Sequence, residues 1–236
     1  MIPSTDDGRV LFAIPWLGKV LIGTTDKAVS EVTREPVPEE QEIRYLLDHL
    51  RRYLNRPPER SDIRSVFSGL RPLVRRSQSK STASLSREHS ILTSRSGLIT
   101  VIGGKWTTYR QMGEDLVDLV ENNSGWKRRL SVTGELSIEI PEASSIKADL
   151  NTRTDGGELT AHEQAFVHYC VQNEMAQTIE DILARRSRLL FLHATAAIET
   201  APSVAAIMSK ALGKPAEWAS EQVDQFRRFA ARFVAG

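Results

Sequence analysis

The spacing of apolar residues changes near residue 159, and this change limits the folds that the chain can adopt. Before it, short runs rich in Val, Ile and Leu have the length of β-strands and are separated by turn residues. After it, apolar residues recur at helical spacing. Residues 141–158, rich in Pro, Ser, Asn, Asp and Gly, show neither pattern. We predict an α+β protein, with a partial β-sheet domain over 1–140, a linker over 141–158 and an all-helical domain over 159–236.

The first part is expected to combine short strands with two helices. Leu17 and Gly18 lie between two apolar runs, which is typical of a β-hairpin. A glycine pair ends the last apolar run and is followed by a helical pattern, so a strand, a turn and a helix succeed one another. The expected strands cover 10–15, 19–24, 63–74, 85–93 and 98–102, and the expected helices cover 39–54 and 106–121.

The second part carries the start signals and apolar faces of a helix bundle. Thr160 and Glu163 have the spacing of a capping box, and Thr178 with Asp181 has a similar one. Two segments present apolar residues on one helical face, and we expect four or five helices in all. The two faces comprise Ile179, Ile182, Leu183 and Leu190, then Val223, Phe226, Ala230 and Phe233.

Composition excludes several classes of protein. The chain has 236 residues, 40% of them apolar, which is enough to bury a core. Cys170 is the single cysteine, and the histidines lack paired ligand spacing, so we expect neither disulfides nor a metal site. No apolar run approaches the ~18–20 residues of a membrane span. The first residues do not resemble a signal peptide, so we expect a reducing, cytoplasmic location.

Positive charge is concentrated between Arg51 and Arg110. This segment holds 13 Lys or Arg residues and three acids, whereas the whole chain has a net charge of +1. Such a cluster suits a phosphorylated metabolite, a cofactor pyrophosphate, nucleic acid or anionic lipid, and a solvated arginine-rich face gives the same pattern. Few aromatic residues are interleaved with these cations, so we expect no nucleic-acid partner.

The sharpest local motif is the glycine pair Gly103 and Gly104, followed by Lys105. Two glycines let the backbone approach a flat or charged ligand closely. The N–H groups at the start of the next helix can then donate to negative charge, with Lys105 adding a full positive charge. Thr107 and Thr108 offer hydroxyls as helix caps or ligand donors. The alternative is an ordinary tight turn before a capped helix.

Two arginines and one histidine are further candidates. Arg71 lies in an apolar, strand-like run, where it needs an anionic partner that a ligand or an internal carboxylate can supply. Arg87 and His89 share one face of a predicted strand, because side chains alternate. His89 has the chemistry of a general base, although a lone histidine on a strand more often has a structural or surface role. Asp115 fits a solvated helix face.

These segments, taken in order, resemble the C-terminal half of the FAD-dependent, quinone-linked glycerol-3-phosphate dehydrogenases. The resemblance covers nearly the whole chain, and collinear motifs over such a length are more specific than any one motif. The motifs are VLFAIPW at 10–16, GTTD at 23–26, SGLRPL at 68–73, SREH at 86–89, GGKWTTYR at 103–110 and EDILARRSRLLFL at 180–192.

The resemblance implies hydride transfer from C2 of sn-glycerol 3-phosphate to FAD, giving dihydroxyacetone phosphate, with electrons passing on to a membrane quinone. It implies that Arg71 and Lys105 are catalytic and bind substrate, and that Arg87 helps to bind the substrate phosphate. The residues expected beside the flavin are Gly103, Gly104, Lys105, Thr107 and Thr108. The resemblance also allows a homodimer and a cytoplasmic location at the inner face of the cell membrane.

One part of the family pattern is missing from this sequence. The strand–GxGxxG–helix that holds the FAD pyrophosphate does not occur. We therefore expect the isolated chain to bind FAD weakly or not at all, to be inactive and to expose sheet edges. Another FAD-dependent oxidase of the same fold, or a noncatalytic interaction module, remains an alternative. Convergence of Arg71, Arg87 and Lys105 on one cleft would favour the dehydrogenase.

Overall fold

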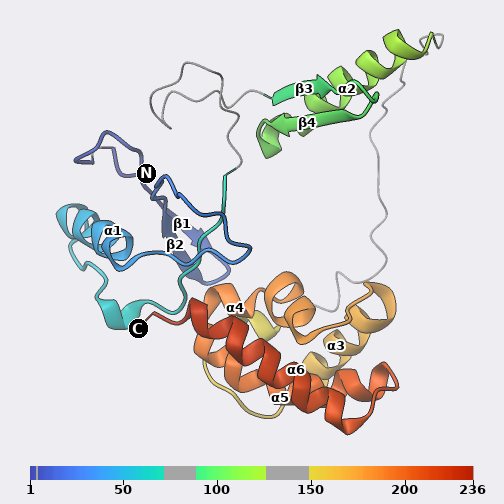
Figure 1. Cartoon of the computed structure of the whole chain (residues 1–236). Coiled ribbons are helices and arrows are strands. Elements are labelled where there is room, and N and C mark those ends of the chain that lie inside the picture. Colours follow the sequence, from blue (N-terminus) through green and yellow to red (C-terminus); the bar gives the residue numbers. More distant parts are fainter. Residues whose placement is uncertain (4, 72–88, 126–148, 236) are drawn as a thin grey trace. The chain divides into compact units, whose positions relative to one another are not determined.

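A computed structural model describes residues 1–3, 5–71, 89–125 and 149–235 of the chain (Figure 1). The described residues fall into two compact units. The first unit draws on residues 1–27, 31–69 and 139–236, and the second on residues 28–30 and 70–138. Each unit is described by itself. The described strands form two separate two-stranded antiparallel sheets among helices, so the expected α+β class is confirmed.

The first unit begins with a β-hairpin. Strands β1 (Phe12–Trp16) and β2 (Lys19–Gly23) pair antiparallel, with Trp16 opposite Lys19. Leu17 and Gly18 both have positive φ, 47° and 74°, as the central residues of a type I′ hairpin turn do. The hairpin predicted from these two turn residues is confirmed.

Helix α1 (Glu40–Tyr53) follows and packs against the start of the chain. The Glu42 carboxylate accepts the backbone N–H of Glu39 at 2.9 Å, which satisfies a donor that the first helical turn would leave free. Leu50 is buried in a small cluster with Ile2 and Leu11. The helix ends before the two prolines that follow it, as predicted, and the short helix η1 (Arg60–Asp62) comes next.

The strand predicted over 63–74 is wrong for its described part, residues 63–71, which form no strand. This segment runs along the helical domain instead, and helix ends satisfy its backbone. The Val66 N–H donates to the Phe233 carbonyl at 2.9 Å, and the Arg64 carbonyl accepts the Ala194 N–H at 2.9 Å. Within this segment, Phe67 packs on the helical domain, where its ring meets that of Phe191 edge to face at 5.1 Å.

The described residues of the first unit after 149 are mostly helical, and the first long helix among them has a satisfied cap. The Thr160 hydroxyl accepts the Glu163 N–H at 3.2 Å, and the Glu163 carboxylate accepts the Thr160 N–H at 2.8 Å, so the predicted capping box is confirmed. The helices are η5 (Asp149–Thr152), α3 (Ala161–Asn173), η6 (Asp181–Arg186), α4 (Leu189–Leu192), α5 (Ala194–Ala211), α6 (Ala216–Ala230) and η7 (Ala231–Phe233).

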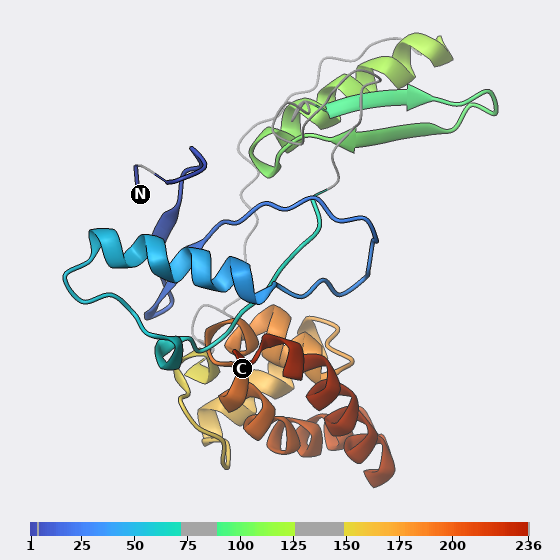
Figure 2. The ribbon, with the colours of Figure 1, turned by 60° about the vertical axis from the view of Figure 1, so that its left-hand side comes forward.

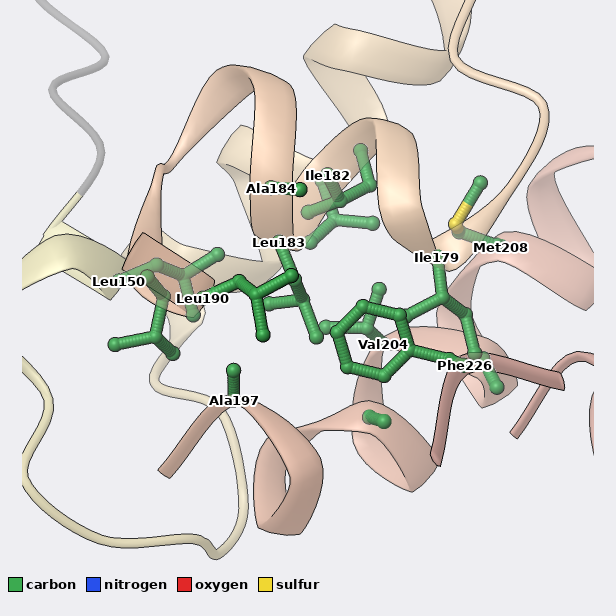
Figure 3. Close-up of a cluster of buried hydrophobic side chains, with 14 of the residues drawn as sticks. Leu150, Ile179, Ile182, Leu183, Ala184, Leu190, Ala197, Val204, Met208 and Phe226 are labelled. Carbon is green, nitrogen blue, oxygen red and sulfur yellow. The ribbon is translucent and has the colours of Figure 1, made fainter. Parts of the chain in front are cut away.

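These helices enclose the main hydrophobic core of the described residues (Figure 3). The predicted faces point inward: Ile179, Ile182, Leu183 and Leu190 are fully buried, and Phe226 of α6 meets them in the same cluster. Leu150, which falls in the predicted linker, is also fully buried there. The domain limits at 140 and 158 stay a prediction, because residues 126–148 lie outside the described residues.

The second unit is a hairpin followed by a helix. Strands β3 (His89–Thr93) and β4 (Ile99–Gly103) pair antiparallel, with His89 opposite Gly103. The short helix η3 (Trp106–Thr108) leads directly into α2 (Tyr109–Ser124), and both views of the ribbon show α2 lying along this hairpin (Figure 2). The predicted succession of strand, glycine turn and helix is therefore present.

Candidate functional site

The glycine pair forms the turn between β4 and η3. Gly103 and Gly104 have φ values of 81° and 80°, in the left-handed region that favours glycine. A Cβ at Gly104 would lie 2.4 Å from Met112 Sδ and 3.4 Å from His89 Cβ. The positive φ therefore favours glycine at this position, and a side chain here would also make the end of the Met112 side chain move. The close approach that the sequence suggested for a ligand is made at Gly104 by side chains of the protein itself.

Lys105 follows the turn with its side chain exposed. Its backbone N–H donates to the Thr108 hydroxyl at 3.3 Å, and that hydroxyl donates to the Lys105 carbonyl at 3.0 Å. Thr108 therefore fixes the start of η3. No carboxylate of the described residues lies within ion-pair distance of the Lys105 ammonium. An exposed cation that the described residues leave without a counter-charge is suited to bind an external anion.

An exposed aromatic pair lies beside this lysine and was not predicted. The rings of Trp106 and Tyr109 stack with centroids 5.7 Å apart and planes inclined by 30°. Trp106 is 87% exposed and Tyr109 is 64% exposed. The sequence GGKWTTYR at 103–110 contained a signal for this pair. Aromatic residues at positions i and i+3 at the start of a helix share one face.

His89 is held by an aspartate of α2. Its Nε2 lies 2.7 Å from Asp115 Oδ2, and the Gln111 side-chain amide donates to Asp115 Oδ1 at 2.7 Å. The His89 side chain is 20% exposed and that of Asp115 40% exposed. The expectation of a solvated Asp115 is therefore only half right, because the carboxylate is partly exposed but both of its oxygens have partners.

The structure describes only one of the two arginines that were predicted to bind substrate. Arg71 is exposed and belongs to the second unit, as Lys105 does. Arg87 lies outside the described residues. The convergence of Arg71, Arg87 and Lys105 on one cleft therefore stays a prediction. Two surface grooves of the first unit, one along α1 and one between α5 and α6, contain none of the predicted site residues.

No group of three or more His, Cys, Asp or Glu side chains in the described ranges is arranged to hold a metal ion. In the same ranges, no helix combines the length and apolar character needed to cross a membrane.

The succession of sheet, glycine turn and helical domain has counterparts in two family models. Residues 1–110 match the model described as FAD dependent oxidoreductase. Residues 99–222 match the model described as the C-terminal domain of alpha-glycerophosphate oxidase. The second match covers more than half of the chain. The chain therefore belongs to the alpha-glycerophosphate oxidase C-terminal domain family, and the predicted resemblance is confirmed.

Curated relatives agree with this assignment. The chain is 34% identical to a mitochondrial glycerol-3-phosphate dehydrogenase of Arabidopsis thaliana, over 89% of this chain and 41% of the relative. It is 32% identical to the mitochondrial glycerol-3-phosphate dehydrogenase of Homo sapiens, over 96% of this chain and 37% of the relative. The chain thus spans about two fifths of the length of these relatives.

A solved structure shares the fold. The glycerol-3-phosphate dehydrogenase from Bacillus halodurans, complexed with FAD, superposes with a TM-score of 0.70 at 22% identity. The superposition covers 97% of this chain and 52% of that one. At this identity the likeness concerns the fold alone.

Proposed function

We propose that this chain supplies the substrate-facing and flavin-facing residues of an FAD-dependent dehydrogenase that oxidises sn-glycerol 3-phosphate to dihydroxyacetone phosphate. The observation that carries the proposal is Lys105, an exposed cation at a glycine turn with no carboxylate partner among the described residues. A phosphorylated substrate provides the counter-charge that the turn lacks. Family membership supplies the chemical context, because alpha-glycerophosphate is the same phosphorylated alcohol.

The residues at the turn fit a role beside FAD but not a role in holding all of it. When bound, FAD would accept the hydride that leaves C2 of the substrate. Lys105 would attract the substrate phosphate and stabilise negative charge that develops next to it. Arg71 and Arg87 are proposed to complete the phosphate site. Gly103, Gly104, Thr107 and Thr108 are proposed to lie beside the flavin, although Thr108 already bonds to the Lys105 backbone.

The FAD pyrophosphate requires residues beyond those in this sequence. The GxGxxG turn that binds a pyrophosphate at a helix N-terminus does not occur in the chain. Because the chain spans about two fifths of its curated relatives, we propose that it acts together with an FAD-holding part. The isolated chain is proposed to bind FAD weakly or not at all.

The remaining features of the proposal rest on the resemblance. We propose that a membrane quinone is the electron acceptor, that the enzyme forms a homodimer, and that it lies in the cytoplasm at the inner face of the cell membrane. Both relatives described above are mitochondrial glycerol-3-phosphate dehydrogenases. A quinone analogue offered in place of the dye acceptor in the experiment below tests the acceptor directly.

The test is a fusion in which this chain replaces the matching segment of the human relative, which supplies the FAD-holding part. We expect the fusion to bind FAD and to reduce a dye with glycerol 3-phosphate. The variant Lys105→Met should lose about 100-fold or more in kcat/KM, the size of effect found when one charge-stabilising donor is removed. Arg95→Met, an exposed cation in the turn at the opposite end of the β3–β4 hairpin, is the matched control and should retain activity.

Three results would count against the proposal. A fusion that binds FAD but does not oxidise glycerol 3-phosphate would remove the assigned activity. Oxidation of an amino acid or a hydroxy acid without phosphate, in preference to glycerol 3-phosphate, would favour another oxidase of the same fold. Equal losses in Lys105→Met and Arg95→Met would show that the position of Lys105 at the glycine turn is unimportant.

A further inference from the structure

The glycine turn is bracketed by three side chains that the proposed chemistry does not use. His89 begins β3 and lies opposite Gly103, the last residue of β4. Met112, from α2, lies over Gly104 so closely that a Cβ there would be only 2.4 Å from its sulfur. Asp115 lies about one helical turn beyond Met112 and bonds to His89. The turn therefore has strand β3 on one side and helix α2 on the other.

The contact between His89 and Asp115 is specific in its geometry. The imidazole Nε2 and the carboxylate Oδ2 are 2.7 Å apart, so the imidazole carries its proton on Nε2 and donates it. The second carboxylate oxygen accepts from the Gln111 amide, also at 2.7 Å, which fixes the carboxylate plane. Both side chains are partly shielded, with 20% of His89 and 40% of Asp115 exposed. A charged acceptor in this setting holds its donor in one orientation.

We propose that His89, Asp115 and Gln111 form a positioning cluster that holds the Gly103–Gly104 turn and thereby orients Lys105. The reason lies in the connectivity. Lys105 follows the turn with no side-chain partner among the described residues, and its backbone N–H and carbonyl both bond to Thr108 at the start of η3. The contact between His89 and Asp115 joins the strand opposite the turn to the helix that follows it. Loss of this contact removes the polar side-chain link between β3 and α2 across two glycines, the residues whose backbone moves most easily.

The role in orienting Lys105 for its ligand rests on the proposed function, but the effect on the turn does not. The test uses the 236-residue chain alone and measures amide hydrogen exchange by NMR at Lys105, whose N–H donates to the Thr108 hydroxyl. His89→Gln places an amide nitrogen near the position of Nε2 and should retain the bond to Asp115. His89→Asn is too short to reach it. Glu114→Ala, an exposed neighbour of Asp115 on α2, is the control.

We expect exchange at Lys105 to rise about fivefold in His89→Asn and in Asp115→Ala, as loss of one net hydrogen bond predicts. His89→Gln should restore exchange to within about twofold of the original chain, and Glu114→Ala should leave it unchanged. The amides of Ile91 and Val101, paired at the middle of the hairpin, report whether the strands remain intact.

Three outcomes would overturn the inference. They are unchanged exchange at the turn in His89→Asn, equal effects of His89→Gln and His89→Asn, or loss of protection at Ile91 and Val101 together with the turn. The last would mean that His89 supports the whole hairpin rather than the turn. Because no substrate or flavin enters the measurement, these results are independent of the fusion experiment, so failure of this inference and failure of the proposed function remain distinguishable.

Discussion

Two features of the folded chain favour glycine at position 104. Its φ of 80° disfavours any side chain, and the space that a Cβ would occupy is filled by Met112 and His89. We therefore predict that Gly104→Ala lowers the protection free energy of the β3–β4 amides by about 1–3 kcal/mol, through overpacking and backbone strain. Hydrogen exchange measures the loss.

The matched control for that substitution is Gly113→Ala. Gly113 lies within α2, and a Cβ built there meets nothing within 4 Å. Alanine is the better helix former by about 0.5–1 kcal/mol, so this variant should stabilise the unit slightly. If Gly104→Ala were as well tolerated as Gly113→Ala, the close approach at the turn would not be a feature of the protein in solution.

The single cysteine is predicted to be unreactive in the folded chain. Cys170 is fully buried in the helical core, and burial raises the pKa of its thiol to about 12, with the carboxylate of Glu174 adding to the effect. Because the thiolate is the reactive form, iodoacetamide at pH 8 should label the native chain negligibly and the unfolded chain with one equivalent. Rapid labelling of the native chain would contradict this burial.

The same shift in pKa predicts how stability depends on pH. The unfolded thiol has a pKa of about 8.5, so the folded state holds its proton more tightly. The stability that the thiol contributes is fully present below that pH. It is lost as pH rises from about 8.5 toward 12, because the unfolded chain then gives up the proton first. Urea unfolding measures the free energy of unfolding of this chain and of Cys170→Ala across that pH range. The difference between the two values isolates the contribution of the thiol.

At the scale of elements, helix α3 begins on a buried ion pair. Arg153 Nη1 lies 3.0 and 2.9 Å from the two carboxylate oxygens of Glu163, which also accepts the Thr160 N–H. The side chains are only 12% and 5% exposed. Glu163→Gln should therefore lower the free energy of unfolding of the helical domain by about 3 kcal/mol, because it leaves a shielded guanidinium without its counter-charge.

The control for that prediction is an exposed pair in the same domain. Glu180 lies 2.5 Å from Arg185, whose side chain is 56% exposed. Glu180→Gln should cost less than ~1 kcal/mol, because water screens the pair. Urea unfolding followed by circular dichroism compares the two variants, and equal losses would mean that the capping carboxylate of α3 is not special.

The elements that could be predicted from sequence are those fixed by local chemistry. The turn residues Leu17 and Gly18 identified one hairpin, and the Thr160 and Glu163 spacing identified the start of α3. Residues 63–71 were mispredicted because the choice between pairing with a strand and packing on helices depends on segments far along the chain, such as Phe191 and Phe233.

The candidate site also combines features that local sequence patterns predict with contacts that they do not predict. The glycine turn and Lys105 were predictable, since a glycine pair between an apolar run and a helix is a local pattern. The contact between His89 and Asp115 was not predictable. The two residues lie in different elements, the first in strand β3 and the second in helix α2, and no spacing rule joins them. The packing of Met112 over Gly104 is equally nonlocal, and it gives that glycine a structural reason that the sequence did not reveal.

At the scale of the whole molecule, the first hairpin exposes apolar side chains on both of its faces. Phe12 and Ile14, on one face, are 43% and 47% exposed, and Val20, on the other, is 59% exposed. Exposed apolar side chains on a strand are available for contact with another part of a protein. This exposure agrees with the proposal that the chain works beside an FAD-holding part.

The most direct measurement of the central proposal is anaerobic reduction of the flavin in the fusion. On addition of sn-glycerol 3-phosphate, the oxidised flavin absorbance should bleach, whereas glycerol should leave it unchanged. The Lys105→Met fusion should retain its flavin but bleach about 100-fold more slowly. Equal bleaching by glycerol, or an unchanged rate in Lys105→Met, would contradict the proposal that this turn binds a phosphorylated alcohol beside the flavin.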